Sequence, residues 1–183
     1  NVYIAKYNSI GDVQWVKTGL SNSFNRASYG LAVSNDTEIY ITGVFESTIN
    51  FSGTVLTGQQ GGDIFLAKYN SEGALAWAIQ ASGLSFSDEA RDVFVDDKDN
   101  VYITGSFGQT VNFGNNTLTS VSQSDIFVAK YTFAGDPIWA IQDAVAQAFN
   151  NWGVGVTVDS AGNVALISEV SEVGTGEVND LYV

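Results

Sequence analysis

Carboxylates are the only abundant side chains of this sequence that could carry acid–base chemistry. The chain has 20 Asp and Glu residues but no His and no Cys, which excludes Ser-His-Asp triads, thiol nucleophiles and the common zinc sites. A glycosidase would need two carboxylates flanking the bond that it cleaves. The sequence consists of repeats, described below, each with four expected strands. Asp92 is the only acid expected in the middle of the first strand of a repeat, because the equivalent residues of the other repeats are Gly30 and Gly155. We therefore predict no catalytic residue, and no cofactor.

A second group of residues has the chemistry of a carbohydrate site. A Trp ring can stack on a sugar, and neighbouring amides can hydrogen-bond its hydroxyl groups. The candidate ligand-binding residues are Trp152, Asn150, Asn151, Arg91, Asp92 and Tyr29. The competing interpretation, which we favour for Trp152, is that its ring fills space created by a one-residue insertion in the third repeat.

Metal binding and covalent modification leave weaker signals. The segment "DDKDN" at Asp96–Asn100 is acidic, but it lacks the spacing of a calcium loop and is better explained as a hairpin turn. We predict no metal site. Asp159-Ser160-Ala161 resembles an O-glycosylation motif of exported Bacteroidota proteins, which makes Ser160 a candidate acceptor.

The charge of the chain restricts its partners. The net charge is −13, which disfavours nucleic acids and anionic membranes. No stretch approaches the roughly 20 apolar residues of a membrane span, so we expect no membrane insertion. Carbohydrate or another surface protein remains as the expected partner.

The residues named so far are carried by a sequence that repeats every 62 residues. "DIFLAKYNSEGALAW" at Asp63–Trp77 is echoed by "NVYIAKYNSIGDVQW" at Asn1–Trp15 and by "DIFVAKYTFAGDPIW" at Asp125–Trp139. We divide the chain into repeats at about 1–62, 63–124 and 125–183. The third repeat lacks the "YITG" and "NFG" segments and has one extra residue before Trp152.

Each period is expected to contain four antiparallel β-strands. In one period these are Ala90–Val95, Val101–Phe107, Asp125–Tyr131 and Pro137–Gln142, separated by turns rich in Asp, Asn, Ser and Gly. Pro137 cannot donate a ladder hydrogen bond, which predicts that its strand lies at the sheet edge. "DIFVA" and "VYITG" are apolar on both faces, so each sheet must lie between neighbours.

Repeated four-stranded sheets packed face to face predict an all-β fold of the β-propeller class. The regular spacing argues against an immunoglobulin-like sandwich, whereas a solenoid remains the stronger rival because it also stacks repeats. Three repeats are fewer than the about four to eight blades of a propeller. We expect an excerpt of a longer chain, in which remaining blades of the same or a neighbouring chain complete the ring.

The pattern DIFVAKY, then Gly and Trp, followed later by GNVYITG and NFG, resembles the SBBP β-propeller repeat of bacterial surface and secreted proteins. This resemblance covers essentially the whole chain. It implies a bladed ring in a large extracellular protein, with an extracellular or cell-surface location in a bacterium. It provides no established catalytic residues.

Comparison of the repeats separates packing residues from variable ones. Phe24, Phe86 and Phe149 recur as expected anchors beneath loops, and the Lys, Tyr and Trp of each repeat are expected to be structural. The structural set comprises Lys6, Tyr7, Trp15, Lys68, Tyr69, Trp77, Lys130, Tyr131 and Trp139. The connections between strands two and three and between strands four and one are long and share one face, where binding usually evolves.

The function expected from these patterns is a structural or adhesive module that binds glycan or protein through its long-loop face. One alternative is a carbohydrate-active hydrolase or lyase whose channel is completed by further repeats. Another is a purely architectural stalk.

Overall fold

The computed structural model describes residues 1–22, 26–59, 61–83, 85, 88–143 and 148–172. Every regular element in these ranges is a β-strand, and all strand pairs are antiparallel. The all-β prediction is therefore confirmed. No helix in the described part of the chain has the length and apolar character needed to span a membrane.

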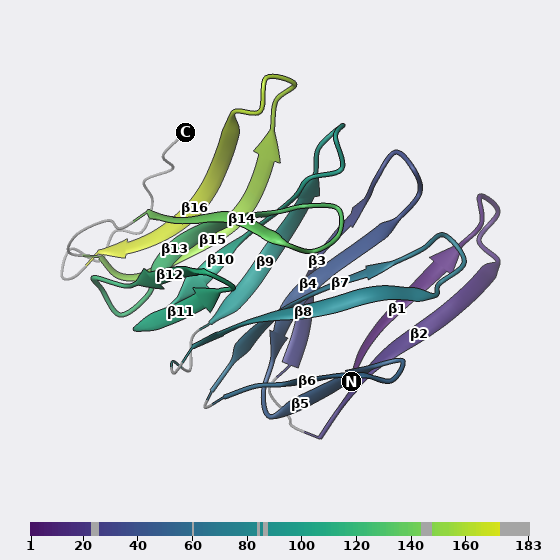
Figure 1. Cartoon of the computed structure of the whole chain (residues 1–183), viewed down its shortest axis with the longest axis horizontal. Coiled ribbons are helices and arrows are strands. Elements are labelled where there is room, and N and C mark those ends of the chain that lie inside the picture. Colours follow the sequence, from purple (N-terminus) through teal and green to yellow (C-terminus); the bar gives the residue numbers. More distant parts are fainter. Residues whose placement is uncertain (23–25, 60, 84, 86–87, 144–147, 173–183) are drawn as a thin grey trace.

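The strands form four sheets that lie side by side (Figure 1). Sheet 1 contains β1 (Val2–Tyr7), β2 (Val13–Ser21), β5 (Thr48–Phe51) and β6 (Thr54–Thr57). Sheet 2 contains β3 (Arg26–Val33), β4 (Ile39–Phe45), β7 (Asp63–Tyr69), β8 (Leu75–Gly83), β11 (Thr110–Phe113) and β12 (Asn116–Thr119). Sheet 3 contains β9 (Glu89–Val95), β10 (Val101–Phe107), β13 (Asp125–Tyr131) and β14 (Pro137–Asp143), and sheet 4 contains β15 (Ala148–Val158) and β16 (Val164–Glu172).

The four-stranded unit predicted from the repeat is present in sheets 2 and 3. The spatial orders are β3-β4-β7-β8 and β9-β10-β13-β14, so consecutive strands of the unit are neighbours. Pro137 lies in β14 at one edge of sheet 3, as its missing N–H requires. The "DDKDN" segment forms the β9–β10 turn, where Asp99 has a φ of 59° and the Asp96 carboxylate accepts the Lys98 and Asn100 N–H groups.

The "NFG" segments differ from the prediction because they are strands and not long loops. β5 with β6, and β11 with β12, form hairpins between the second and third strands of a unit. Their apolar side chains alternate with polar ones, as a sheet with one buried face requires. In β11 and β12 the buried members are Val111, Phe113 and Leu118.

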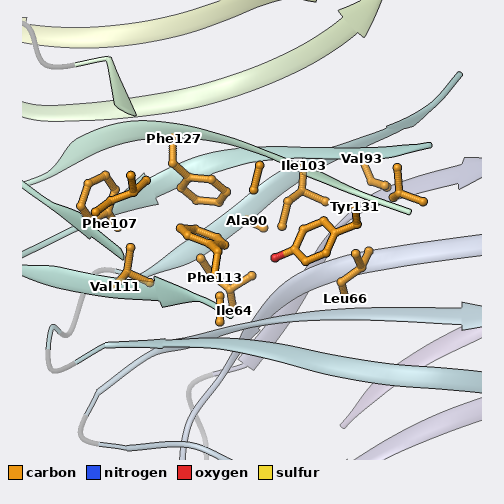
Figure 2. Close-up of a cluster of buried hydrophobic side chains, with 14 of the residues drawn as sticks. Ile64, Leu66, Ala90, Val93, Ile103, Phe107, Val111, Phe113, Phe127 and Tyr131 are labelled. Atoms are coloured by element: carbon orange, nitrogen blue, oxygen red, sulfur yellow. The ribbon is translucent and has the colours of Figure 1, made fainter. Parts of the chain in front are cut away.

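Each hairpin joins two sheets. The backbone of β11 pairs with β8 of sheet 2, while the Phe113 ring packs 4.8 Å from the Phe127 ring of sheet 3. β5 repeats this arrangement, since it pairs with β2 of sheet 1 while Phe51 lies 5.2 Å from Phe65 of sheet 2. Figure 2 shows Phe113 and Phe127 together in the core between sheets 2 and 3.

The core lies between the sheets because the middle strands are apolar on both faces. Every residue of β4, β7 and β10 is buried. One cluster fills the space between sheets 1 and 2, a second the space between sheets 2 and 3, and a third the space between sheets 3 and 4. This burial confirms, for sheets 2 and 3, that a sheet with two apolar faces lies between neighbours.

A β-bulge recurs in the first strand of each unit, which we call the inner strand: β3, β9 and β15. The register skips Tyr29 in β3, Arg91 in β9 and Val154 in β15. Gly43 and Gly105 of the "ITG" segments lie opposite the first two bulges, where a Cβ would overlap the carbonyl oxygens of Ala27 and Glu89. The repeated Gly is therefore explained by the bulge.

We expect Gly105→Ala to lower the free energy of unfolding by about 1–3 kcal/mol, because the added methyl group would displace the β9 backbone. Ser168 occupies the equivalent position in β16 and already carries a Cβ. Ser168→Ala is thus a matched control with an expected change below about 0.5 kcal/mol. Urea denaturation of both variants checks the prediction, and equal effects would contradict the proposed role of Gly105.

Candidate functional site

The repeated Trp residues connect each sheet to the next. Trp15 of sheet 1 donates its indole N–H to the Ser71 carbonyl oxygen of sheet 2 at 3.1 Å. Trp77 of sheet 2 donates in the same way to the Phe133 carbonyl oxygen of sheet 3 at 3.2 Å. Gly73 in the first of these turns has a φ of 79°, and a Cβ there would lie 2.7 Å from the Trp15 ring. These Trp rings contact protein and do not form an open platform.

Two of the repeated Lys residues, Lys6 and Lys68, contact the following sheet, whereas Lys130 contacts a ring of its own sheet. Lys68 is buried, with its Nζ 3.2 Å from Glu38 Oε2 and 3.0 Å from the centre of the Phe133 ring. Lys6 donates to the Ser71 carbonyl oxygen at 2.9 Å, and Lys130 lies 4.9 Å from the centre of the Tyr102 ring. Each ammonium group is therefore placed against groups that pack the sheets.

The repeated Tyr and Trp side chains have different surroundings in different repeats. Tyr69 and Tyr131 are buried, whereas Tyr7 on the outer face of sheet 1 is 57% exposed. Trp139 is half-buried against Tyr102, with ring centres 6.1 Å apart.

The bulges bring together side chains that are not repeated. Arg91 directs its Nε to Glu89 Oε1 at 2.7 Å and a terminal nitrogen to the same oxygen at 2.6 Å. The guanidinium carbon of Arg91 lies 5.6 Å from the centre of the Trp152 ring on β15. On β3, the pKa of Tyr29 is raised by partial burial and, to a smaller extent, by the charge of Glu89. The Glu89 carboxylate also accepts a hydrogen bond from the Tyr29 hydroxyl group.

Tyr29, Glu89, Arg91 and Trp152 thus form one group across three neighbouring inner strands, and we call it the bulge cluster. Tyr29 is 51% exposed, while the Arg91 and Glu89 side chains are 31% and 18% exposed. The cluster combines two aromatic rings with an ion pair that remains accessible. This combination can stack on an apolar ring face and exchange hydrogen bonds with hydroxyl groups.

Glu89 is the member of the cluster that the sequence analysis missed. The pairing of the inner strands with β4, β10 and β16 shows that Ala27, Glu89 and Trp152 occupy equivalent positions in the three units. The signal was present in the sequence, because Glu89 precedes Arg91 by two residues and differs in type from both counterparts. The bulge, which turns both side chains toward each other, was not visible in the sequence.

Asp92 does not join the bulge cluster. Its Oδ2 accepts the backbone N–H of Val156 at 2.9 Å, which links β9 of sheet 3 to β15 of sheet 4. At the equivalent position of β3, a Cβ on Gly30 would lie 2.8 Å from the Val93 nitrogen. Between sheets 2 and 3, the β3 backbone at Gly30 therefore approaches the β9 backbone directly. Between sheets 3 and 4, the Asp92 carboxylate makes the connection to β15 instead.

Asn151 is also placed away from the cluster. It is fully buried, and its backbone N–H and C=O exchange hydrogen bonds with the Ser124 hydroxyl group at 3.1 and 3.2 Å. The backbones of Phe149 and Asn150 belong to β15, but their side chains lie outside the described part of the structure, as do Phe24 and Phe86 entirely. The anchor role expected for the three Phe residues remains a prediction.

The other sequence candidates lie at turns. Ser160 is exposed in the β15–β16 turn, where the Asp159 carboxylate accepts the Ala161 and Asn163 N–H groups. Asp96 is engaged in its own turn, and hydrogen bonds from Asn100 contribute to holding its pKa below the usual value against the opposing effect of burial. Among the described residues, no three acidic, His or Cys side chains are grouped as a metal site would require.

No protein-family model matches the chain. The chain is similar to an uncharacterized WD repeat-containing protein of Acanthamoeba polyphaga mimivirus, with 31% identity over 145 residues. The match covers 72% of this chain and 10% of the viral protein. The chain thus spans about a tenth of the length of the curated relative that it matches. The relative is a repeat protein by its name, and the described part of this chain is all-β with antiparallel sheets.

Asp92→Ala should lower the free energy of unfolding by about 1–3 kcal/mol, because it leaves the Val156 N–H without its acceptor. Asp92→Asn keeps an oxygen at the same position and should cost less than half as much. Denaturant midpoints at constant m-value measure both changes. A stable Asp92→Ala variant would show that the carboxylate is free for another role.

Proposed function

We propose that this chain is a segment of an extracellular or cell-surface β-propeller, which acts as a non-catalytic adhesive module and binds carbohydrate through the bulge cluster. The observation that carries the proposal is the division between repeated and variable side chains. The repeated Trp and Lys side chains pack one sheet on the next, whereas Tyr29, Glu89, Arg91 and Trp152 vary between repeats and meet at an accessible surface.

The arrangement of the sheets supports a propeller over a solenoid. The inner strands β3, β9 and β15 contact one another in succession. At the opposite edges, hairpin strands are placed between successive outer strands, since β6 contacts β8 and β12 contacts β14. Additional strands at the outer edges are expected when sheets diverge from a common hub.

The outer face of sheet 1 supports a ring with further repeats. Tyr3 is 70% exposed, whereas its counterparts Phe65 and Phe127 are fully buried against a preceding sheet. Val16 and Leu20 extend the same apolar face. A preceding four-stranded unit would cover this face in the way that sheet 1 covers sheet 2.

Neutral carbohydrate is the ligand class that the bulge cluster favours. Arg91 and Glu89 compensate each other's charge, and together they offer both donors and acceptors to hydroxyl groups. Tyr29 and Trp152 provide aromatic surface on either side of the pair. The net charge of −13 disfavours phosphate-rich and strongly anionic ligands.

A carbohydrate-active hydrolase or lyase is the second candidate, because further repeats could add a carboxylate near the hub. Within the described residues, Asp92 bonds to Val156 and Glu89 to Arg91, so neither is an available partner for general acid–base work. Polysaccharide hydrolysis by the full-length chain that is lost in Asp92→Asn would support this candidate. The architectural stalk predicts neither binding nor hydrolysis.

Binding of the purified chain to a glycan array tests the proposal. Trp152→Ala and Arg91→Ala should each weaken binding to a captured glycan by at least about ten-fold, as expected for central contact residues. Tyr7→Ala is the matched control, because it removes an exposed aromatic ring that is not part of the bulge cluster. Unchanged affinity in both cluster variants, or an equal loss in Tyr7→Ala, would contradict the assignment.

A further inference from the structure

Two buried carboxylates meet at the boundary between sheets 2 and 3. Asp63 begins β7 of sheet 2, and Asp88 directly precedes β9 of sheet 3. Both residues are fully buried. Their negative charges interact, and neither has a Lys or Arg partner within the described residues. At this depth it is unfavourable for both carboxyl groups to be ionised, which favours a state in which one of them retains its proton.

The hydrogen bonds distinguish the two groups. Asp63 accepts the Gln59 N–H at 2.7 Å, while Ser82 and Gly83 also favour its ionised form. Asp88 accepts the Gly108 N–H at 3.0 Å through Oδ1. Among the described residues, both Asp88 Oδ2 and Asp63 Oδ1 are buried oxygens without a partner at hydrogen-bonding distance. The number of contacts that favour the ionised form is therefore larger for Asp63 than for Asp88. Asp88 Oδ2 borders Gly83 of β8, where the Thr110 carbonyl oxygen also approaches. The Thr110 carbonyl oxygen therefore places an acceptor close to Asp88 Oδ2.

The next boundary in the chain contains a neutral group at the same position. The registers of β9 and β15 make Asn151 the counterpart of Asp88, while Asp125 is the counterpart of Asp63. Asn151 is fully buried like Asp88, and it resembles a protonated Asp in shape and charge. The chain therefore uses one carboxylate with one amide between sheets 3 and 4, but two carboxylates between sheets 2 and 3.

We propose that Asp63 and Asp88 form a proton-operated latch between sheets 2 and 3. With the proton on Asp88 the two sheets remain closely packed. Release of this proton to solvent leaves two carboxylates facing each other in the core and loosens the contact. No other reactant is required.

The pKa of Asp88 agrees with this geometry, since burial and then the charge of Asp63 raise it to about 7. Burial also raises the pKa of Asp63. The remaining charged groups nearby are engaged elsewhere: Glu89 with Arg91, and Asp125 with the Val121 N–H and the Ser122 hydroxyl group. Because the folded pKa of Asp88 lies above the unfolded value, the folded state loses stability as pH rises from about 4 to 7.

Thermal denaturation at pH 5 and pH 8 tests the latch. The melting temperature of the natural chain should fall by roughly 5 °C or more between these values. Asp88→Asn should remove most of this fall and should melt above the natural chain at pH 8. Glu72→Gln, which removes one exposed charge, is the matched control and should keep the full dependence.

The reverse substitution tests the same idea in the next boundary. Asn151→Asp places a second carboxylate there and should add a further loss of stability as pH rises. Hydrogen exchange at the Gly108 amide of the natural chain should accelerate above pH 7 beyond the intrinsic effect of pH. Equal pH dependence in Asp88→Asn and Glu72→Gln would overturn the proposal. Addition of calcium to the natural chain at pH 8 is a further control. If calcium raised the melting temperature to its value at pH 5, the proposal would also be overturned, because the pair would then be a cation site.

Discussion

The structure depends on the burial of both faces of the two middle sheets, sheets 2 and 3. β4, β7 and β10 have no exposed residue, so one sheet alone would present two apolar surfaces to water. A neighbouring copy covers each surface, and this requirement explains why the sequence is repeated at a fixed interval. The hairpins strengthen the contact, because β11 pairs with sheet 2 while Phe113 is buried against sheet 3.

This packing divides the side chains into two classes. Trp15, Trp77 and Lys68 recur because each contacts a turn of the next sheet, and the Gly of the "ITG" segment recurs because a bulge lies opposite it. Positions that the packing does not constrain can vary. The bulge cluster occupies such positions, whereas the Asp63–Asp88 pair is buried between two sheets and varies only at Asp88, where the next boundary has Asn151. One scaffold thus carries a candidate binding surface and a candidate latch.

Much of the fold followed from the sequence, but the connections between sheets did not. Strand order and the edge position of Pro137 could be predicted because they depend on local periodicity and on a missing donor. The hairpins were mistaken for loops because their strands have only four residues and pair with the last strand of the preceding four-stranded unit. Glu89 and the burial of Asn151 were missed for the same reason, since the one depends on a bulge and the other on packing between sheets.

The central claim is that each hairpin belongs to the sheet that precedes the four-stranded unit whose second and third strands it connects. The chain has no Cys, so a single engineered pair can test this claim directly. Ser82 and Asn112 are partners in the β8–β11 ladder. In a Ser82→Cys, Asn112→Cys double variant, we expect an intramolecular disulfide to form under mild oxidation without loss of β structure. Two free thiols in the folded monomer would contradict the account.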